Sequence, residues 1–384
     1  MANQFYIFAK TLLEESGETL NKFVKIDNGK IVEIGNERAE ELKVIEVDYL
    51  APGLIDTHVH GNTGKDTMDS SYESINQMSI EIASYGVTAF CPTTLTAPKE
   101  KIAKALSAVN EARIKGVLGA EVIGAFVEGP YFTETHRGAH PVEFMERASD
   151  ENVTLFTETF NESISTIALA PEIDENMSNI PKFIEKGIRV AIAHTDSDYE
   201  TCMRAFDFGA SVGVHLFNGM KGLHHREPGT VGAILRDDRV YAELIADGHH
   251  VHPDVIELVY RCKGKEKLIL ISDAMRATGM EDGVYQLGEL SVVVESGIAR
   301  TSYGSLAGST LKLIDSVFNV EKWTSASLED AIYMASMAPA KSLGIDDEMG
   351  SISIGKKANL IAIENRELSK TWVEGKLVFD REEQ

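Results

Sequence analysis

Short runs in which apolar and polar residues alternate occur at both ends of the chain. They include FYIFAK, FVKIDNGKIVEIG and KVIEVDYLAPG near the N-terminus, and GSISIGKKANLIAIE and KTWVEGKLVFD within the last residues. Alternation with a period of two predicts β-strands, and Asn28-Gly29 and Glu374-Gly375 are typical of tight hairpin turns. Because both ends are rich in strands and the middle is not, we expect residues 1–51 and 350–384 to meet in one small β-sandwich domain.

The central part of the chain, residues 52–349, repeats two kinds of segment. Continuous apolar runs, typical of buried strands, include residues 86–92, 121–129, 188–194, 210–218, 242–247 and 267–273. Between them lie segments with helical spacing of apolar residues, such as SYESINQMSIEIASYG and PKEKIAKALSAVNEARIK. A chain that repeats strand and then helix builds a parallel sheet covered by helices. We therefore expect an α/β protein with a (β/α)8 TIM-type barrel; a doubly wound open sheet is the alternative, but no GxGxxG follows the first strand.

Composition and charge narrow the classes of partner. The chain has 384 residues and a formal net charge of -23, which argues against nucleic acid and against anionic membranes. Its three cysteines form no CxxC pair, so neither a disulfide framework nor a thiolate zinc site is expected. The N-terminus lacks the pattern of a signal peptide, and no apolar run reaches membrane-spanning length. We expect a cytoplasmic protein.

Six side chains at or near the ends of apolar runs can bind a metal or carry a proton. These residues are His58, His60, Glu128, His194, His215 and Asp273. A barrel places the carboxyl ends of its strands around one cavity, so residues far apart in the sequence would converge there. Taken singly, each is more often a solvated strand end or a capping group, and HxH alone is a weak signal. Six such residues at equivalent positions predict a metal site.

The types of ligand indicate the chemistry of this site. Imidazole and carboxylate without thiolate favour a catalytic zinc or iron over a structural zinc. His58 and His60 (the HxH pair) can hold one divalent ion and the other two histidines a second, with Glu128 as a bridge between them. One or two ions per subunit would activate a water for attack on a carbonyl. Asp273 would act as the general base, taking the proton of the water and returning it to the leaving group, and the reaction would be hydrolysis.

Longer motifs around these residues carry a resemblance to a known family. PGLIDTHVHG, EGP, AHT, HLFNGM and SDA together resemble the amidohydrolase superfamily. VEGPYFTETHRGAHP, REPGTVGAIL, IADGHHVHPD and SLAGST resemble, more narrowly, the N-acetylglucosamine-6-phosphate deacetylases. The resemblance spans nearly the whole chain and implies metal-dependent hydrolysis of N-acetyl-D-glucosamine 6-phosphate to D-glucosamine 6-phosphate and acetate, in amino-sugar catabolism and recycling.

The same resemblance implies roles for individual residues. Glu128, His194 and His215 match the principal metal ligands of the family, and Asp273 matches its catalytic acid and base. Some members have lost both histidines of the HxH pair and hold one metal, whereas this chain keeps them. The sequence leaves the metal and the number of ions open.

An anionic substrate in so acidic a protein needs local donors. Asn218 and Gly219 lie three and four residues after the metal-ligand candidate His215, so we expect their N–H groups to face the same cavity. Arg226 has the fork geometry that suits phosphate. By resemblance, His250 matches the phosphate-side histidine and His140 a position that orients the sugar and the carbonyl. Leu306, Ala307 and Gly308 look like a lid over the acetyl methyl.

The resemblance also implies a homodimer, in which Arg226 acts in its own subunit or reaches across from the neighbouring one. The alternative for Arg226 is an ordinary surface arginine. Two other functions compete with deacetylation. A dihydroorotase-like amidohydrolase would share the metals and Asp273 but would not need Arg226 and His250 together. A catalytically silent relative would be expected to have lost ligands, and none is missing.

Overall fold

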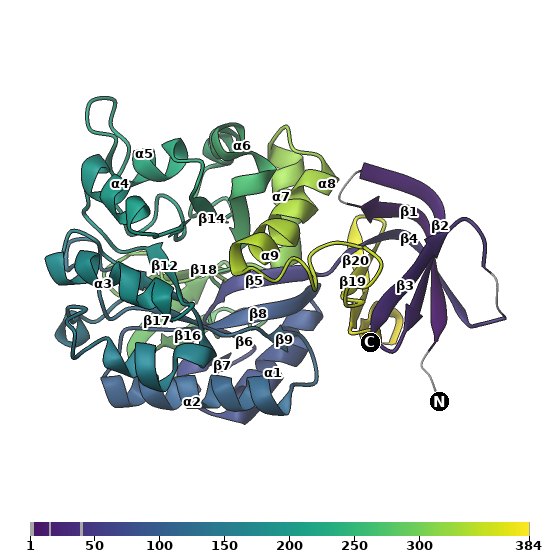
Figure 1. Cartoon of the computed structure of the whole chain (residues 1–384), viewed down its shortest axis with the longest axis horizontal. Coiled ribbons are helices and arrows are strands. Elements are labelled where there is room, and N and C mark those ends of the chain that lie inside the picture. Colours follow the sequence, from purple (N-terminus) through teal and green to yellow (C-terminus); the bar gives the residue numbers. More distant parts are fainter. Residues whose placement is uncertain (1–3, 15–16, 39–40, 384) are drawn as a thin grey trace.

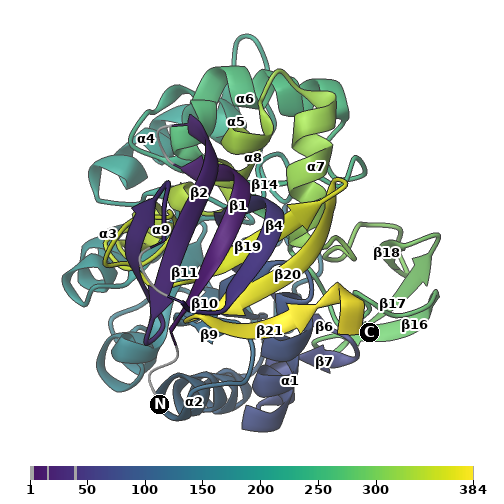
Figure 2. The same ribbon diagram turned by 90° about the vertical axis from the view of Figure 1, so that its right-hand side faces the viewer.

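Strands from both ends of the chain form one seven-stranded sheet in the computed structural model, which describes residues 4–14, 17–38 and 41–383. The strands are β1 (Phe5–Glu14), β2 (Gly17–Asp27), β3 (Lys30–Gly35), β4 (Val44–Pro52), β19 (Leu360–Glu364), β20 (Glu367–Val373) and β21 (Lys376–Asp380). Their order across the sheet is β21-β20-β19-β4-β1-β2-β3, so the C-terminal strand β19 pairs with β4. Figure 2 shows the purple N-terminal strands beside the yellow C-terminal strands.

Within the described residues, eight parallel strands make up the barrel. They are β5 (Leu54–Val59), β8 (Val87–Thr94), β10 (Ala125–Glu128), β11 (Ile164–Leu169), β12 (Arg189–Ile192), β13 (Val212–Gly213), β14 (Tyr241–Ile245) and β15 (Leu268–Ile271), and the short strand β9 (Glu121–Val122) pairs with β8. The segment after β15 returns to β5, where the Asp273 N–H donates to the His58 carbonyl at 2.9 Å. The (β/α)8 barrel and the sheet from both termini are thus confirmed, while the boundaries given above remain a prediction.

Helices surround the barrel strands and separate them along the chain (Figure 1). Their bounds are α1 (Tyr72–Ala83), α2 (Lys99–Lys115), α3 (Asp174–Glu185), α4 (Tyr199–Asp207), α5 (Gly229–Arg236), α6 (Pro253–Lys267), α7 (Leu313–Trp323), α8 (Leu328–Ala335) and α9 (Met337–Leu343). Helix α1 illustrates how they form: Ser71 caps its N-terminus, and Ile75, Met78 and Ile82 recur at helical spacing and are buried. Among the described residues, no helix combines the length and the apolar character needed to span a membrane.

Three features differ from the sequence prediction. The run 210–218 yields only a two-residue strand, because His215 and Phe217 have φ angles of 31° and 78°, which end an extended strand. A small antiparallel sheet of β16 (Gly283–Leu287), β17 (Leu290–Glu295) and β18 (Ile298–Thr301) follows the last barrel strand and was not expected. A second insertion, the hairpin of β6 (Gly61–Asn62) and β7 (Lys65–Asp66), directly follows the HxH pair.

Both hairpin turns expected from the sequence are confirmed. Asn28 and Gly29 join β2 to β3 with φ angles of 49° and 81°. Glu374 and Gly375 join β20 to β21 with φ angles of 45° and 70°. These positive φ angles are those of the turn type that fits the twist of two antiparallel strands.

Candidate metal centre

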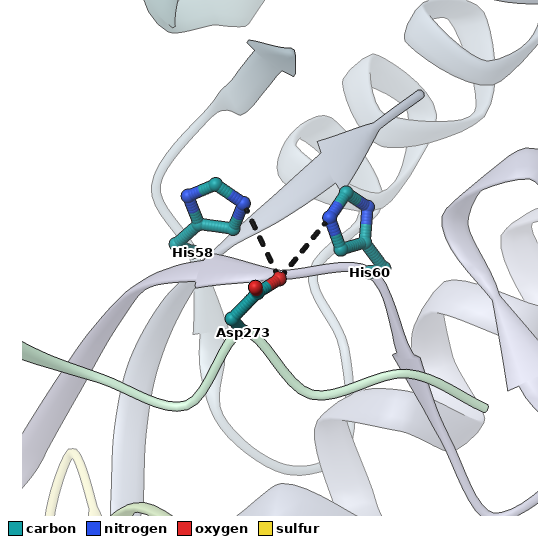
Figure 3. Close-up of side chains that lie close together, drawn as sticks. All are labelled: His58, His60 and Asp273. Atoms are coloured by element: carbon teal, nitrogen blue, oxygen red, sulfur yellow. Dashed lines mark ion pairs between the residues drawn. The ribbon is translucent and has the colours of Figure 1, made fainter. Parts of the chain in front are cut away.

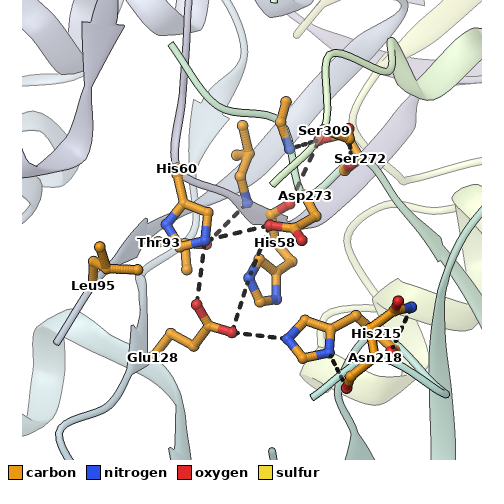
Figure 4. A network of polar contacts seen from close by, with 12 residues as sticks. His58, His60, Thr93, Leu95, Glu128, His215, Asn218, Ser272, Asp273 and Ser309 are labelled. Carbon is orange, nitrogen blue, oxygen red and sulfur yellow. Dashed lines mark hydrogen bonds and ion pairs between the residues drawn. The ribbon is translucent and has the colours of Figure 1, made fainter. Parts of the chain in front are cut away.

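The carboxyl ends of five barrel strands bring the six candidate residues to one place. His58 lies in β5 with His60 just beyond it, Glu128 ends β10, His194 and His215 follow β12 and β13, and Asp273 follows β15. All six side chains are buried. Figure 4 shows Glu128 between the HxH pair on one side and His215 on the other.

One group of ligand atoms consists of Glu128, His194 and His215. Glu128 Oε1 lies 3.2 Å from His194 Nε2 and 3.0 Å from His215 Nε2. The Nδ1 atoms of the two rings face backbone carbonyls, those of His136 at 2.8 Å and Asn218 at 3.1 Å. With the Nδ1 protons donated to these carbonyls, neutral rings turn their Nε2 lone pairs toward a carboxylate oxygen, an arrangement that a cation stabilises.

The second group consists of the HxH pair and Asp273 (Figure 3). Asp273 Oδ1 lies 3.3 Å from His60 Nε2 and 3.6 Å from His58 Nε2. Glu128 Oε2 also lies 3.3 Å from His60 Nε2, so the two oxygens of one carboxylate face the two groups. Both ring nitrogens of His58 and Nδ1 of His60 are buried without a hydrogen-bond partner among the described residues. Of these three atoms, Nε2 of His58 faces both Glu128 and Asp273, and an unsatisfied buried nitrogen beside two carboxylates fits a divalent metal.

The surrounding charges keep both carboxylates ionised. Burial by itself would raise the pKa of Glu128, but the neighbouring imidazoles, His58 foremost, hold it well below its ordinary value. Burial likewise opposes ionisation of Asp273, and its contacts with His60 and His58 outweigh this and lower its pKa. The lowered pKa of each group favours the deprotonated form that a metal ligand and a general base need.

His140 presents a neutral ring to the same space. Burial, together with the nearby His194, lowers the pKa of His140 to about 4. Nδ1 of His140 lies 2.8 Å from the Thr96 hydroxyl oxygen and 3.4 Å from the Thr96 nitrogen, whose N–H points at it. With Nδ1 as the acceptor of Thr96, the proton of the neutral ring lies on Nε2. Nε2 lies 3.5 Å from Glu128 Oε2, so its N–H is directed at the centre and can donate to a substrate oxygen there.

A cavity of about 300 Å³ opens onto these groups. Its walls contain all the residues predicted for substrate except Arg226: His140, Asn218, Gly219, His250, Leu306, Ala307 and Gly308. His250 is held by Asp247, whose Oδ2 lies 2.6 Å from its Nδ1. Leu95 and Leu287 also line the cavity, and sequence reasoning missed both because nothing distinguishes them from core leucines.

Arg226 lies apart from this cavity. Its guanidinium is exposed, its Nη1 lies 2.6 Å from His225 Nε2, and it borders a separate depression with Asp198 and Lys221. No lysine or arginine occurs among the described residues that line the metal-centre cavity. Within its own subunit, Arg226 therefore makes no contact with the metal-centre cavity.

Comparison with known proteins adds a family. Residues 49–378 match the amidohydrolase family. The chain is 46% identical to the N-acetylglucosamine-6-phosphate deacetylase of Vibrio furnissii over 359 residues, which covers 92% of this chain and 90% of that protein. It is 39% identical to the N-acetylgalactosamine-6-phosphate deacetylase of Escherichia coli O157:H7 over 372 residues, covering 96% and 98% of the two chains.

A solved structure gives the same result in three dimensions. It is that of an N-acetyl-D-glucosamine-6-phosphate deacetylase mutant from Mycobacterium smegmatis in complex with N-acetyl-D-glucosamine-6-phosphate. The two folds superpose with a TM-score of 0.93 at 27% identity, covering 98% of this chain and 99% of the other.

Proposed function

This chain belongs to the amidohydrolase family and is an amide hydrolase of the N-acetylglucosamine-6-phosphate deacetylase type, and we propose that it converts N-acetyl-D-glucosamine 6-phosphate and water to D-glucosamine 6-phosphate and acetate. The observation that carries the proposal is Glu128, set between two pairs of histidines at the floor of a cavity. A cytoplasmic enzyme of amino-sugar catabolism and recycling fits the free cysteines of the chain.

The residues divide the chemistry between them. Glu128, His194 and His215 would hold one divalent zinc or iron, and the HxH pair would hold a second ion; when bound, these ions would supply Lewis acidity toward a water and the amide carbonyl. Asp273 is ionised and lines the cavity. It accepts a proton from the water while the oxygen of the water attacks the carbonyl carbon. The C–N bond then breaks, and Asp273 returns the proton to the departing amine. His140 donates its Nε2–H to the carbonyl oxygen and orients the amide.

The substrate is held from its two ends. Leu306, Ala307 and Gly308 form the wall that covers the acetyl methyl. His250 and the backbone N–H groups near Asn218 and Gly219 bind the phosphate. The proposal includes a homodimer in which Arg226 of the neighbouring subunit completes the phosphate site; it is supported by the lack of a lysine or arginine among the described walls of the cavity.

Release of acetate tests the proposal directly. The metal-loaded protein is assayed with N-acetylglucosamine 6-phosphate, N-acetylgalactosamine 6-phosphate and unphosphorylated N-acetylglucosamine. The galactosamine compound is the second candidate, because the relative at 39% identity is named for it. We expect the highest kcat/KM with N-acetylglucosamine 6-phosphate and a loss of about ten- to a hundredfold without the phosphate. Equal rates with and without phosphate would overturn the proposed substrate.

A further inference from the structure

We infer that Glu243 is a positioning residue that orients His58 toward the metal centre. Glu243 is the third residue of β14 and is 1% exposed, and His58 in β5 is fully buried. Its Oε2 lies 3.5 Å from His58 Nδ1. The two atoms are paired as an ion-pair contact, and neither makes a hydrogen bond among the described residues. The inference rests on the proposed function in one respect, namely that the HxH pair holds a divalent ion.

The carboxylate of Glu243 is itself fixed. The Thr57 hydroxyl donates to Oε1 at 2.7 Å, and Thr57 directly precedes His58 on β5. One carboxylate oxygen is therefore tied to β5, and the other faces the ring that β5 carries. Nε2 of His58, on the far side of the ring from Glu243, lies 3.7 Å from Glu128 Oε1 and 3.6 Å from Asp273 Oδ1.

Among the four candidate histidine ligands of the metal centre, three have an Nδ1 neighbour, and these neighbours differ in kind. His194 and His215 meet backbone carbonyls, which are neutral, whereas His58 meets a carboxylate. A carboxylate is the stronger acceptor for Nδ1–H, so it fixes the tautomer, leaves the Nε2 lone pair free for a metal and makes the ring a better ligand. A buried glutamate with an unused oxygen would otherwise be costly. Glu243 thus distinguishes the ion on the HxH pair from the ion on the other two histidines.

Metal binding to the whole protein tests this role without reference to turnover. Metal-free wild type and Glu243→Gln are titrated with Co²⁺ in competition with a chelator, and the visible absorption of cobalt is recorded. We expect the ion on the HxH pair to bind about 10–100-fold more weakly in Glu243→Gln. The ion on Glu128, His194 and His215 should keep its affinity. A wild type that saturates at one ion, or a variant with both affinities unchanged, would overturn the inference.

A purely structural role, in which Glu243 only ties β14 to β5 through Thr57, makes a different prediction. The matched experiment introduces Glu243→Gln into a His58→Ala chain. If Glu243 acts through His58, adding Glu243→Gln to the His58→Ala chain should not change the affinity of the ion on Glu128, His194 and His215. If it is structural, that ion should weaken as well. Should Glu243→Gln fail to fold, Thr57→Val removes the donor that fixes the carboxylate and should weaken the same ion selectively.

The proposed function is judged separately, by acetate release from the wild type. A wild type that binds two ions with the expected dependence on Glu243, yet releases no acetate from either sugar phosphate, would remove the proposed substrate and keep the role of Glu243. Deacetylation with no effect of Glu243→Gln on metal binding would do the reverse.

Discussion

At the scale of single residues, Glu128 connects the two ligand groups. Its Oε1 faces His194 and His215, and its Oε2 faces His60. A substitution of Glu128 therefore acts on both groups, whereas each histidine belongs to one group only. The two groups can be separated experimentally by comparing these substitutions.

The metal content of variants at these residues should differ according to the group that each substitution affects. Glu128→Ala or His194→Ala should lose most of the bound metal, because either change removes a ligand of the group with two oriented imidazoles. The matched variant His60→Ala should lose at most one ion and keep some turnover. Metal analysis of the purified proteins by mass spectrometry gives the stoichiometry, and full metal content with normal activity in Glu128→Ala would show that the ion lies elsewhere.

Asp273→Asn preserves the shape of the side chain but removes its ability to accept a proton. We expect kcat to fall about 10²-fold or more, as for the loss of a general base. The ion on Glu128, His194 and His215 should remain, because Asp273 is not a member of that group. Steady-state acetate release and metal analysis on the same preparation check both points. Near-normal kcat would mean that another group takes the proton.

The candidate ligands were predictable because each one ends an apolar run, and parallel barrel strands end at one face. Glu243 was not predicted, although an isolated acid within the apolar run AELIAD is a signal that could have found it. Whether a side chain of a barrel strand points inward depends on strand tilt and register. The alternation of residues along one strand does not give the tilt or the register, so the orientation of Glu243 could not be predicted. The direction of Arg226 was not predictable either, because it lies on a loop whose turns are set by local backbone contacts.

At the scale of elements, the hairpin of β6 and β7 fixes the backbone just after the HxH pair. The N–H groups of His60 and Gly61 both donate to the Ala274 carbonyl, and Gly61 pairs with Asp66 across the hairpin. A Cβ on Gly61 would lie 2.2 Å from the Lys65 carbonyl oxygen. Position 61, directly after His60, therefore requires glycine.

Gly61→Ala should destabilise the protein by about 1–3 kcal/mol through overpacking against backbone atoms, which cannot move aside as a side chain can. Gly222→Ala is the matched control, since a Cβ there meets no atom within 4 Å. Thermal unfolding of the metal-free proteins compares the two. A Gly61→Ala midpoint equal to that of the control would show that the hairpin shifts at no cost.

At the scale of the whole molecule, charge and subunit arrangement limit how a sugar phosphate is held. A net charge of -23 repels the substrate at long range, so affinity depends on close donors. Within the described chain, those at the cavity are His250 and backbone N–H groups, with no arginine or lysine beside them. The proposed homodimer would add Arg226 of the neighbouring subunit to these donors.

Arg226→Ala should lower kcat/KM for the phosphorylated sugar about ten- to a hundredfold, since a charge-assisted contact contributes roughly 1.5–3 kcal/mol. The loss should be much smaller for N-acetylglucosamine. Mixed dimers of Arg226→Ala and Asp273→Asn chains should regain part of the activity, because one of their two sites combines an intact Asp273 with an intact Arg226 from the other chain. Equal losses on both sugars, or no recovery on mixing, would exclude this role.

The pairing of β4 with β19 has a consequence for biosynthesis. Ribosomes deliver the chain from its N-terminus, and β4 leads directly into the strand that carries His58. The Gly53 N–H, at the junction of the two, donates to the Asn359 carbonyl at 2.9 Å, and Leu360 then pairs with Pro52. Until residues near 360 have left the exit tunnel, β4 has an open edge, which is the part of a sheet most prone to wrong pairing. β4, which leads into the first metal-binding strand to be translated, is thus among the last strands to gain both its neighbours, and we expect a nascent chain stalled before Leu360 to expose this edge.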